Sequence, residues 1–364
     1  MKPQELWNIL HAAGFTRQEA MPAISPRAPW YLEAILFLAL WTGAALIVLA
    51  FVALAQDSAA ANLFFGLLLA GLACWLFRAR PGHFFLGQLA HAASLCGVGL
   101  IVLALFEEVR GTEAQLRFLL ALAFLVFCAM NNFVQRLVAA SAALLVIALL
   151  CQSYWKDSFL WLEWLEWLYA GCAFAFVLVW QMEMKTLRYP RHQLWRSVGY
   201  ALALFLLVAM NVSFSLWAWT GSGGIPDVPP EPPRILLALR VLSGAALFWF
   251  TAWLLHRENV PFSSRPALML LGVTLCVVLA GMEMPFVAVA LLILVTGFAA
   301  NAPVLLGIGV IMLLNACAQY YYWLEVNLLR KSVYLLLTGG VFLACRLVLL
   351  KTFSHAAVKE GEHE

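Results

Sequence analysis

The segment 84-FFLGQLAHAASLCGVGLIVLALF-106 runs for 23 residues without an Asp, Glu, Lys or Arg. A helix that crosses a hydrocarbon core of roughly 30 Å needs roughly 20 predominantly apolar residues. The apolar residues form a continuous run instead of alternating with polar ones, which favours a helix over a membrane strand. The segment therefore predicts a membrane-spanning helix.

Similar apolar segments, about a dozen in all, fill the chain between Tyr31 and Lys351. Hydrophobic residues make up 64% and charged residues 11% of the 364, a composition that excludes a soluble globular domain. We predict an all-α, polytopic transmembrane helical bundle of about 12 spans. The expected helices are 31–55, 60–77, 84–106, 116–131, 134–151, 159–182, 195–219, 234–256, 266–282, 286–300, 303–321 and 332–350. The segments 116–131 and 286–300 are short, and each is interpreted as a tilted neighbour of the next helix or as a re-entrant element.

The distribution of Lys and Arg predicts the orientation of the chain, because cytoplasmic loops carry an excess of these residues. If the N-terminus is cytoplasmic, the inner cations outnumber the outer ones by about two to one. The inner group includes Arg136, Lys185, Arg196, Arg257 and Arg265, whereas Arg117 belongs to the outer group. We therefore expect both termini to be cytoplasmic.

The sequence predicts five successive regions. They are a cytoplasmic N-terminal helical segment (1–30), a first six-helix half (31–183), a basic cytoplasmic connector (184–196), a second six-helix half (197–350) and a cytoplasmic tail (351–364). An outer loop rich in Gly and Pro, residues 220–234, lies in the second half.

The two halves show a weak internal similarity. Asn132 and Asn301 lie 169 residues apart, and Tyr154-Trp155 and Tyr322-Trp323 lie 168 apart. Two interpretations are open, a pair of parallel six-helix repeats as in several transporters, or chance matches in an apolar chain.

His91 is the ionisable residue that lies deepest in a predicted span, and Gln88 and Ser94 lie three residues to either side. Ionisable residues inside a membrane are candidates for function because they are costly there. His91 and Gln88 are therefore candidates for a proton or ligand site. The alternative is a neutral histidine that forms a hydrogen bond with a neighbouring helix.

Glu163 and Glu166 form a second candidate polar site, since residues three apart share one face of a helix. Two adjacent carboxylates could bind a cation or share a proton. The alternative is an interfacial belt, because Trp161, Trp164 and Trp167 interleave with them near the predicted outer surface.

Recognisable catalytic and metal-binding motifs are missing from the sequence. It contains no His-Glu-x-x-His, Gly-x-Ser-x-Gly, P-loop or dinucleotide-binding fingerprint, and its eight cysteines lack the spacing of metal ligands. We therefore predict no enzymatic activity, no metal, no cofactor and no binding of nucleic acid.

An aromatic and charged segment near the C-terminal end is a candidate interface with a lipid headgroup or a partner protein. It comprises Tyr320, Tyr321, Tyr322, Trp323, Glu325 and Lys331. Aromatic residues mark a membrane interface, and Lys331 would lie on the outer side against the general distribution of charge.

These residues, together with short motifs elsewhere, resemble a known family. The motifs are Trp7-Asn-Ile-Leu, Pro29-Trp30-Tyr31, Leu305-Leu306-Gly307, Leu328-Leu329-Arg330-Lys331-Ser332 and Gly339-Gly340. The pattern is similar to the bacterial membrane family called domain of unknown function 4401, and distantly to family 2157. The resemblance implies a bacterial inner membrane and a membrane-anchored protein partner, and it carries over no catalytic residue.

Together these features predict a non-enzymatic component of a bacterial envelope complex that acts through partner and lipid contacts. The alternative is a transporter of a lipid or another largely apolar molecule. An intramembrane enzyme is a third hypothesis, and it would depend on His91, Glu163 and Glu166.

Overall fold

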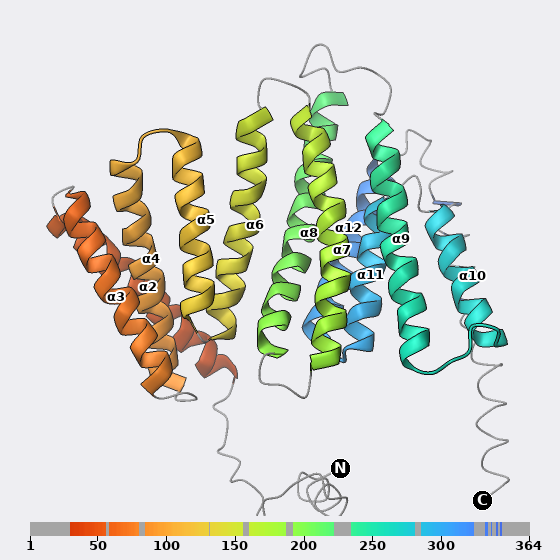
Figure 1. The fold of residues 1–364 in the computed structure, drawn as a ribbon, viewed down its shortest axis with the longest axis horizontal. Coiled ribbons are helices and arrows are strands. Elements are labelled where there is room, and N and C mark those ends of the chain that lie inside the picture. Colours follow the sequence, from red (N-terminus) through yellow and green to blue (C-terminus); the bar gives the residue numbers. More distant parts are fainter. Residues whose placement is uncertain are drawn as a thin grey trace, which may run out of the picture. The chain divides into compact units, whose positions relative to one another are not determined.

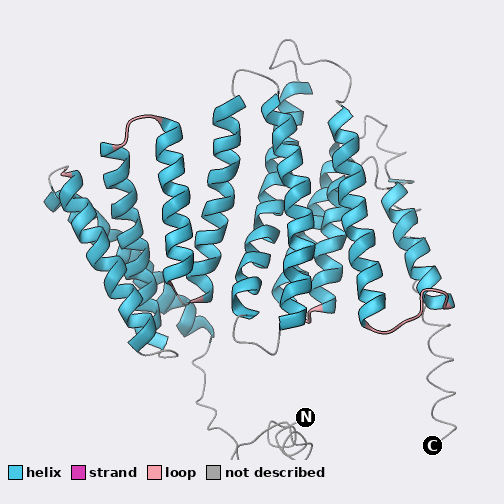
Figure 2. Cartoon of the chain, in the orientation of Figure 1, coloured by secondary structure: helices cyan, strands magenta, loops and turns pink. Residues whose placement is uncertain are grey.

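The computed structural model describes residues 30–55, 58–79, 84–130, 132–155, 160–186, 192–221, 234–280 and 285–323, and the positions 332, 333, 336, 340 and 343. These residues form eleven helices and no strand (Figures 1 and 2). The helices are α2 (Trp30–Ala55), α3 (Ala59–Ala79), α4 (Phe84–Glu108), α5 (Thr112–Ala129), α6 (Phe133–Trp155), α7 (Leu160–Thr186), α8 (His192–Gly221), α9 (Arg234–Arg257), α10 (Arg265–Ala280), α11 (Pro285–Ala299) and α12 (Pro303–Trp323).

The predicted all-α class is confirmed for this part of the chain. The first eleven predicted segments each correspond to one helix, and every helix end lies within four residues of the expected position. The N-terminal segment up to residue 29, most of the Gly- and Pro-rich loop 220–234, the continuous segment 332–350 and the tail 351–364 lie outside the described residues.

Short polar side chains fix where several helices begin. The Asn132 Oδ1 accepts a hydrogen bond from the Val134 N–H at 2.9 Å at the start of α6. Ser58 and Ser264 act in the same way before α3 and α10, where each hydroxyl oxygen accepts a backbone N–H at 3.4 Å. Such caps satisfy N–H groups that have no partner within the helix.

Two helices end at an asparagine in the left-handed conformation. Asn259, with φ of 55°, follows α9, and Asn301, with φ of 50°, follows α11. After Asn301 the Ala302 N–H returns to the Gly297 carbonyl at 2.9 Å. Asparagine tolerates this conformation better than most residues, so the chain reverses within a few positions.

The chain divides into two compact units, residues 1–108 and 109–364. In the first unit α3 and α4 form an extensive contact and α2 packs against both. Gly66 of α3 and Gly97 of α4 bring the two backbones together, since a Cβ built on Gly97 would lie 2.7 Å from the Gly66 carbonyl oxygen. Small residues at helix contacts are typical of membrane proteins, where close packing supplies much of the stability.

The second unit contains α5 to α12, and helices that follow one another in the chain run in opposite directions (Figure 1). Helix α7 contacts α6, α8 and α9, while α11 contacts α9 and α12. Its core consists of large apolar side chains that are almost entirely inaccessible. The largest are Tyr169, Phe176, Trp180, Leu206, Met210, Phe250, Val289, Leu292, Ile293, Leu305 and Met312.

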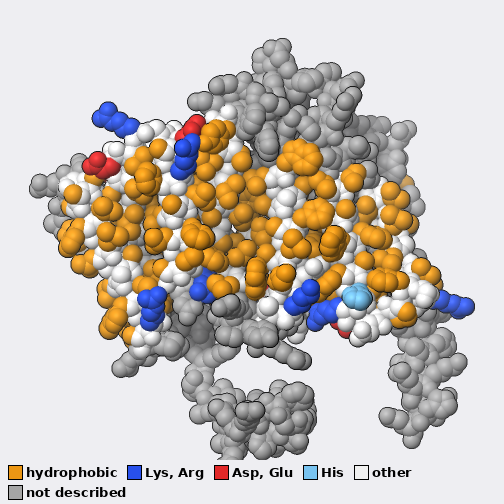
Figure 3. All heavy atoms as spheres, in the orientation of Figure 1, with side chains coloured by type: hydrophobic (Ala, Val, Ile, Leu, Met, Phe, Trp, Pro, Cys, Tyr) orange, Lys and Arg blue, Asp and Glu red, His pale blue; other side chains and the backbone are white. Residues whose placement is uncertain are grey.

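Large apolar side chains also cover the outer surfaces of the helices. Phe124 of α5 is 69% exposed and Phe298 of α11 is 77% exposed. In Figure 3 hydrophobic side chains cover the visible surface of the described helices, and charged side chains lie near the helix ends. Among the described residues, six helices, α3 to α8, are long and apolar enough to cross a membrane. These features are those of a helical multi-pass membrane protein, because lipid is the solvent that such surfaces require.

The two compact units do not coincide with the predicted halves. The boundary between the units follows residue 108, whereas the predicted connector 184–196 lies within the second unit. Compact packing and sequence repetition are separate properties, so the two-half organisation, the count of twelve spans and the position of the termini stay predictions.

Candidate functional site

His91, the central residue of the predicted polar stripe of α4, lies against α3. His91 is buried, and its ring contacts Phe77 of α3 edge to face, with centroids 5.0 Å apart. Ser94 is fully buried, and its hydroxyl has no hydrogen bond among the described residues. The buried Gln88 Oε1 also lacks one. The structure thus places His91 against α3 and buries polar atoms of Gln88 and Ser94, and a ligand role for these residues stays a prediction.

The predicted carboxylate pair lies in the first two turns of α7. The backbone of Glu163 and Glu166 is helical, and their side chains are outside what the structure describes. The same holds for Tyr320 to Trp323 in the last turn of α12, and Glu325 and Lys331 lie outside the described residues altogether.

Helix α7 contains functional candidates that the sequence argument did not select. Tyr169, Phe176 and Trp180 lie on one face of α7 and are at most 2% exposed. The hydroxyl of Tyr169 and the indole N–H of Trp180 are buried without a hydrogen bond in the described part of the chain. Their spacing of seven and four residues, which is helical, could have revealed them.

Glu183 continues this buried face. It is 4% exposed, although it lies one residue past the end of the predicted helix 159–182. Helix α7 extends to Thr186, four residues past the predicted end, and Glu183 follows Trp180 by three residues on the same face. The neighbouring Gln181 is 6% exposed, and its Nε2 has no hydrogen bond within the described ranges.

An amide cluster joins α8 and α12. The Asn315 Nδ2 donates to the Asn211 Oδ1 at 2.7 Å, and the Gln319 Nε2 donates to the same oxygen at 3.4 Å. Asn211 in turn donates to the Leu207 carbonyl of its own helix at 2.8 Å. These amides therefore form hydrogen bonds between the two helices.

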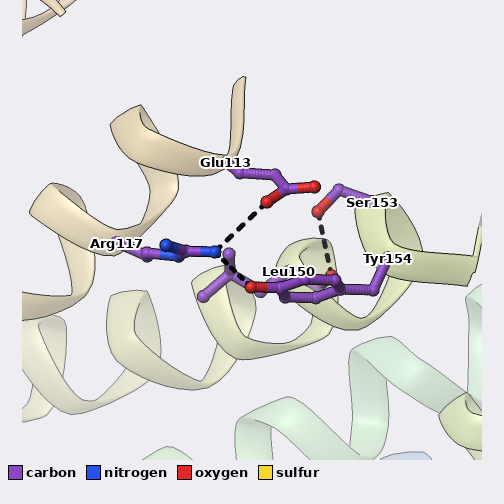
Figure 4. Close-up of polar contacts among 5 residues, drawn as sticks. All are labelled: Glu113, Arg117, Leu150, Ser153 and Tyr154. Carbon is purple, nitrogen blue, oxygen red and sulfur yellow. Dashed lines mark hydrogen bonds and ion pairs between the residues drawn. The ribbon is translucent and has the colours of Figure 1, made fainter. Parts of the chain in front are cut away.

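A charged and aromatic contact joins α5 and α6 at one end of the second unit (Figure 4). The Arg117 Nη2 lies 3.2 Å from the Glu113 Oε2, and it also donates to the Tyr154 hydroxyl. Both charged side chains are largely exposed, at 62% and 46%. Exposed ion pairs contribute about 0–1 kcal/mol, so the Glu113–Arg117 pair within α5 adds little stability. The hydrogen bond of Arg117 to Tyr154 is what joins α5 to α6.

At the opposite end of the second unit the predicted inner cations gather near the helix ends. The Arg196 guanidinium lies 6.0 Å from the centre of the Tyr200 ring, and that of Arg257 lies 5.9 Å from the centre of the Trp253 ring. The Arg136 Nε donates to the Phe127 carbonyl at 3.4 Å. The cations therefore sort to one end as the charge argument requires, whichever side of the membrane that end faces.

An open apolar groove of about 490 Å³ follows the outer face of α9. Its lining residues are Ala245, Phe248, Trp249, Ala252, Trp253, His256 and Phe262. Trp249 is 55% exposed, whereas Trp253 stacks on the buried Phe250 with ring centroids 5.7 Å apart. The groove is thus built on a helix whose other face lies in the core.

The described residues include no group of three His, Cys, Asp or Glu side chains that could hold a metal ion. The seven described cysteines are free thiols. The described part of the chain offers amide hydrogen bonds, contacts of cations with aromatic rings, an exposed ion pair and the buried ionisable side chains of His91 and Glu183.

Fold and polar groups together define a helical multi-pass membrane protein. A family model described as "Domain of unknown function (DUF4401)" matches residues 29–352, and the chain belongs to this family. The resemblance seen in the sequence is thereby confirmed. In comparisons with curated proteins and with solved structures, nothing matches the chain.

Proposed function

We propose that the chain is a non-enzymatic integral component of a complex in the bacterial inner membrane. It acts through contacts with a membrane-anchored partner protein and with lipids. The proposal includes about twelve spans in two parallel six-helix repeats and cytoplasmic termini.

The observation that carries this proposal is the packed interior of the second unit. Phe176 of α7, Leu206 of α8 and Phe250 of α9 are fully buried, and they fill the space between their helices with apolar side chains. Protein interiors of this kind are rigid and close-packed. A rigid apolar bundle with polar groups at its ends is well suited to holding partners.

The candidate interface follows directly after this bundle. Helix α12 packs on α8 and α11 and ends at Trp323, and the interface residues Glu325 and Lys331 come next in the sequence. Partner surfaces are enriched in Tyr and Trp, and oppositely charged groups at their rim favour one partner over others.

The test uses the full chain with an affinity tag in its native host, solubilised in a mild detergent. We expect a membrane-anchored protein to be recovered in near-stoichiometric amount. The variants Glu325→Lys and Lys331→Glu should each lower its recovery at least about fivefold, since misplaced like charges across an interface can cost several kcal/mol.

Glu258→Lys is the matched control, because Glu258 is an exposed carboxylate in the loop between α9 and α10. It should leave recovery unchanged. Repeated recovery of no partner would refute the proposal, as would equal recovery with Glu325→Lys and the original chain.

The α9 groove favours the second candidate function, a transporter of a lipid or another apolar molecule. Reconstitution into vesicles with a labelled lipid in one leaflet tests this function. Faster equilibration of the label with the protein than in protein-free vesicles would support transport, and equal rates would exclude it for that lipid.

A further inference from the structure

The α9 groove combines an apolar channel with a cation at one end. Ala245 and Ala252 leave space on a helix face that otherwise carries large aromatic side chains, including Phe248 and Trp249. His256 lines the end of the groove closest to the C-terminus of α9, and Arg257 follows it.

Arg257 is held at this end by three contacts. Its guanidinium lies over Trp253, a lining residue, with 5.9 Å to the ring centre. Its Nη1 lies 3.0 Å from the Met184 sulfur, and its Nε lies 3.8 Å from the Glu258 Oε1. A guanidinium has five N–H donors, so these contacts leave donors available to an incoming anion.

The local charge at this end is positive in the described residues. Arg257 and Lys185, an exposed residue in the last turn of α7, lie at the same end as two carboxylates, the exposed Glu258 and the buried Glu183. The exposed Arg265 at the start of α10 adds a third cation, so positive charge is in excess. Helices α7 and α9 pack together, which places Lys185 and Arg257 at the same end of the unit. An anionic group fits this place better than a neutral one.

The length of the groove matches one leaflet of a bilayer. From Ala245 to His256 the helix rises about 16 Å at 1.5 Å per residue. The hydrocarbon core is roughly 30 Å thick, so the groove extends from the charged edge to about the middle of the membrane. A lipid acyl chain anchored by its headgroup has this reach.

We propose that the groove binds an anionic phospholipid of the leaflet at the basic end of the second unit. One acyl chain lies between Phe248, Trp249 and Phe262, over Ala245 and Ala252. The phosphate accepts hydrogen bonds from Arg257 and lies beside His256. The inference does not depend on the proposed function, because a specific lipid can bind a scaffold or a transporter.

The charge pattern also favours a lipid over the last apolar segment of the chain as the occupant. That segment, 332–350, carries Arg346 near its C-terminal end and is followed by Lys351. By the predicted topology this end would meet the same basic rim, where like charges repel. A phospholipid brings the opposite charge.

The experiment measures lipids retained by the purified full chain, by native mass spectrometry in mild detergent. Dioleoyl phosphatidylglycerol and dioleoyl phosphatidylcholine serve as probes. We expect a preference for phosphatidylglycerol that falls about fivefold in Arg257→Gln, the effect expected for one basic residue at an anionic surface. Arg117→Gln is the matched control, since Arg117 also lies 5.9 Å from an aromatic ring centre, at the other end of the unit.

A second pair of variants tests the channel itself. Ala252→Trp fills the groove and should reduce the number of retained lipids, whereas Ala142→Trp, at an exposed position of α6, should not. Ala245→Trp closes the far end of the groove. It should reduce binding of dioleoyl more than dilauroyl phosphatidylglycerol, and it serves if Ala252→Trp does not fold.

Three outcomes would overturn the proposal. Equal effects of Arg257→Gln and Arg117→Gln would mean that the anion does not bind at Arg257. Unchanged lipid retention in both Ala252→Trp and Ala245→Trp would show that the groove is not occupied by lipid. An efficient disulfide between a cysteine at Trp249 and one in the segment 332–350 would assign the groove to the chain itself.

Discussion

Replacing Gly97 by alanine should weaken the contact between α3 and α4. A Cβ at this position would lie 2.7 Å from the Ala70 nitrogen and 2.7 Å from the Gly66 carbonyl oxygen, both of which are backbone atoms of α3. Favourable contacts between heavy atoms lie near 3.5–4.0 Å, so the helices would have to separate by about 0.8 Å or more. A radial gap of 0.5–1 Å already loses about a quarter to a half of the attraction at each contact.

Gly99→Ala supplies the matched control within the same helix. A Cβ on Gly99 would meet no atom within 4 Å, so this change brings only the gain in helix propensity, about 0.8–1.0 kcal/mol in a helix interior. Gly97→Ala brings the same gain and adds an overpacking cost of about 1–3 kcal/mol. The free energy of unfolding should therefore differ between the two variants by about 1–3 kcal/mol, with Gly97→Ala the less stable.

The assay is unfolding of the purified full chain in mixed detergent micelles with increasing dodecyl sulfate, followed by circular dichroism. Gly66→Ala should also destabilise, because its Cβ would lie 2.9 Å from the Gly97 carbonyl oxygen. The double variant should lose less than the sum of the two single losses, since the first separation of the helices already makes room for the second methyl group. Equal unfolding midpoints for Gly97→Ala and Gly99→Ala would refute the close approach of the two backbones.

Three further predictions concern the second unit. Gly309→Ala should destabilise by about 1–3 kcal/mol relative to Gly307→Ala in the same unfolding assay, because a Cβ on Gly309 would lie 2.7 Å from a backbone nitrogen of α11 and one on Gly307 meets nothing within 4 Å. Asn315→Leu should lower the free energy of unfolding by about 0.6 kcal/mol. In a double-mutant cycle with Asn211→Leu, most of this loss should appear as coupling energy between the two residues, and additive losses would contradict the hydrogen bond. Tyr154→Phe should lower the free energy of unfolding by at most about 1 kcal/mol, because its partner, the Arg117 guanidinium, is exposed. Thermal unfolding measures this change, and a larger loss would mean that the contact is shielded from water.

The helices could be predicted from the sequence because lipid constrains each residue separately. A residue such as Leu268 or Phe298 must be apolar wherever its helix lies, since it is exposed on the outer surface. Helix ends were predictable to within a turn for the same reason, as polar caps such as Asn132 interrupt the apolar runs.

The pairing of the helices could not be predicted, because it depends on complementary shape between two segments. Gly97 approaches α3 closely and Gly99 touches nothing within 4 Å, yet both are glycines in the same apolar helix. Gly199 of α8 lies against the Trp180 indole of α7, so this contact depends on how two separate helices pair. One chain without an alignment carries no signal that separates these cases.

The candidate site was predicted in part. His91 was selected because a histidine in an apolar run is conspicuous, and the structure indeed buries it against a neighbouring helix. Glu183 was passed over because it lay beyond the predicted end of its helix, and a few more residues of helix turn it onto the buried face of α7. Tyr169 and Trp180 were missed because an aromatic residue in a span is also what the membrane interface favours.

The position of α9 explains why one helix can serve both packing and recognition. Ala246 and Phe250 face the core and are fully buried, whereas Trp249, between them in the sequence, is 55% exposed in the groove. Trp253 connects the two sides, since it stacks on Phe250 and carries the Arg257 guanidinium above its ring. A phosphate bound at Arg257 would therefore shift the guanidinium against Trp253, which packs on the buried Phe250. The same shift would alter the contact of Arg257 with Met184 of α7. Close-packed interiors transmit small displacements. Binding of a lipid in the groove would therefore change the packing of α7 and α9, and through it the binding of a partner protein at another surface of the bundle.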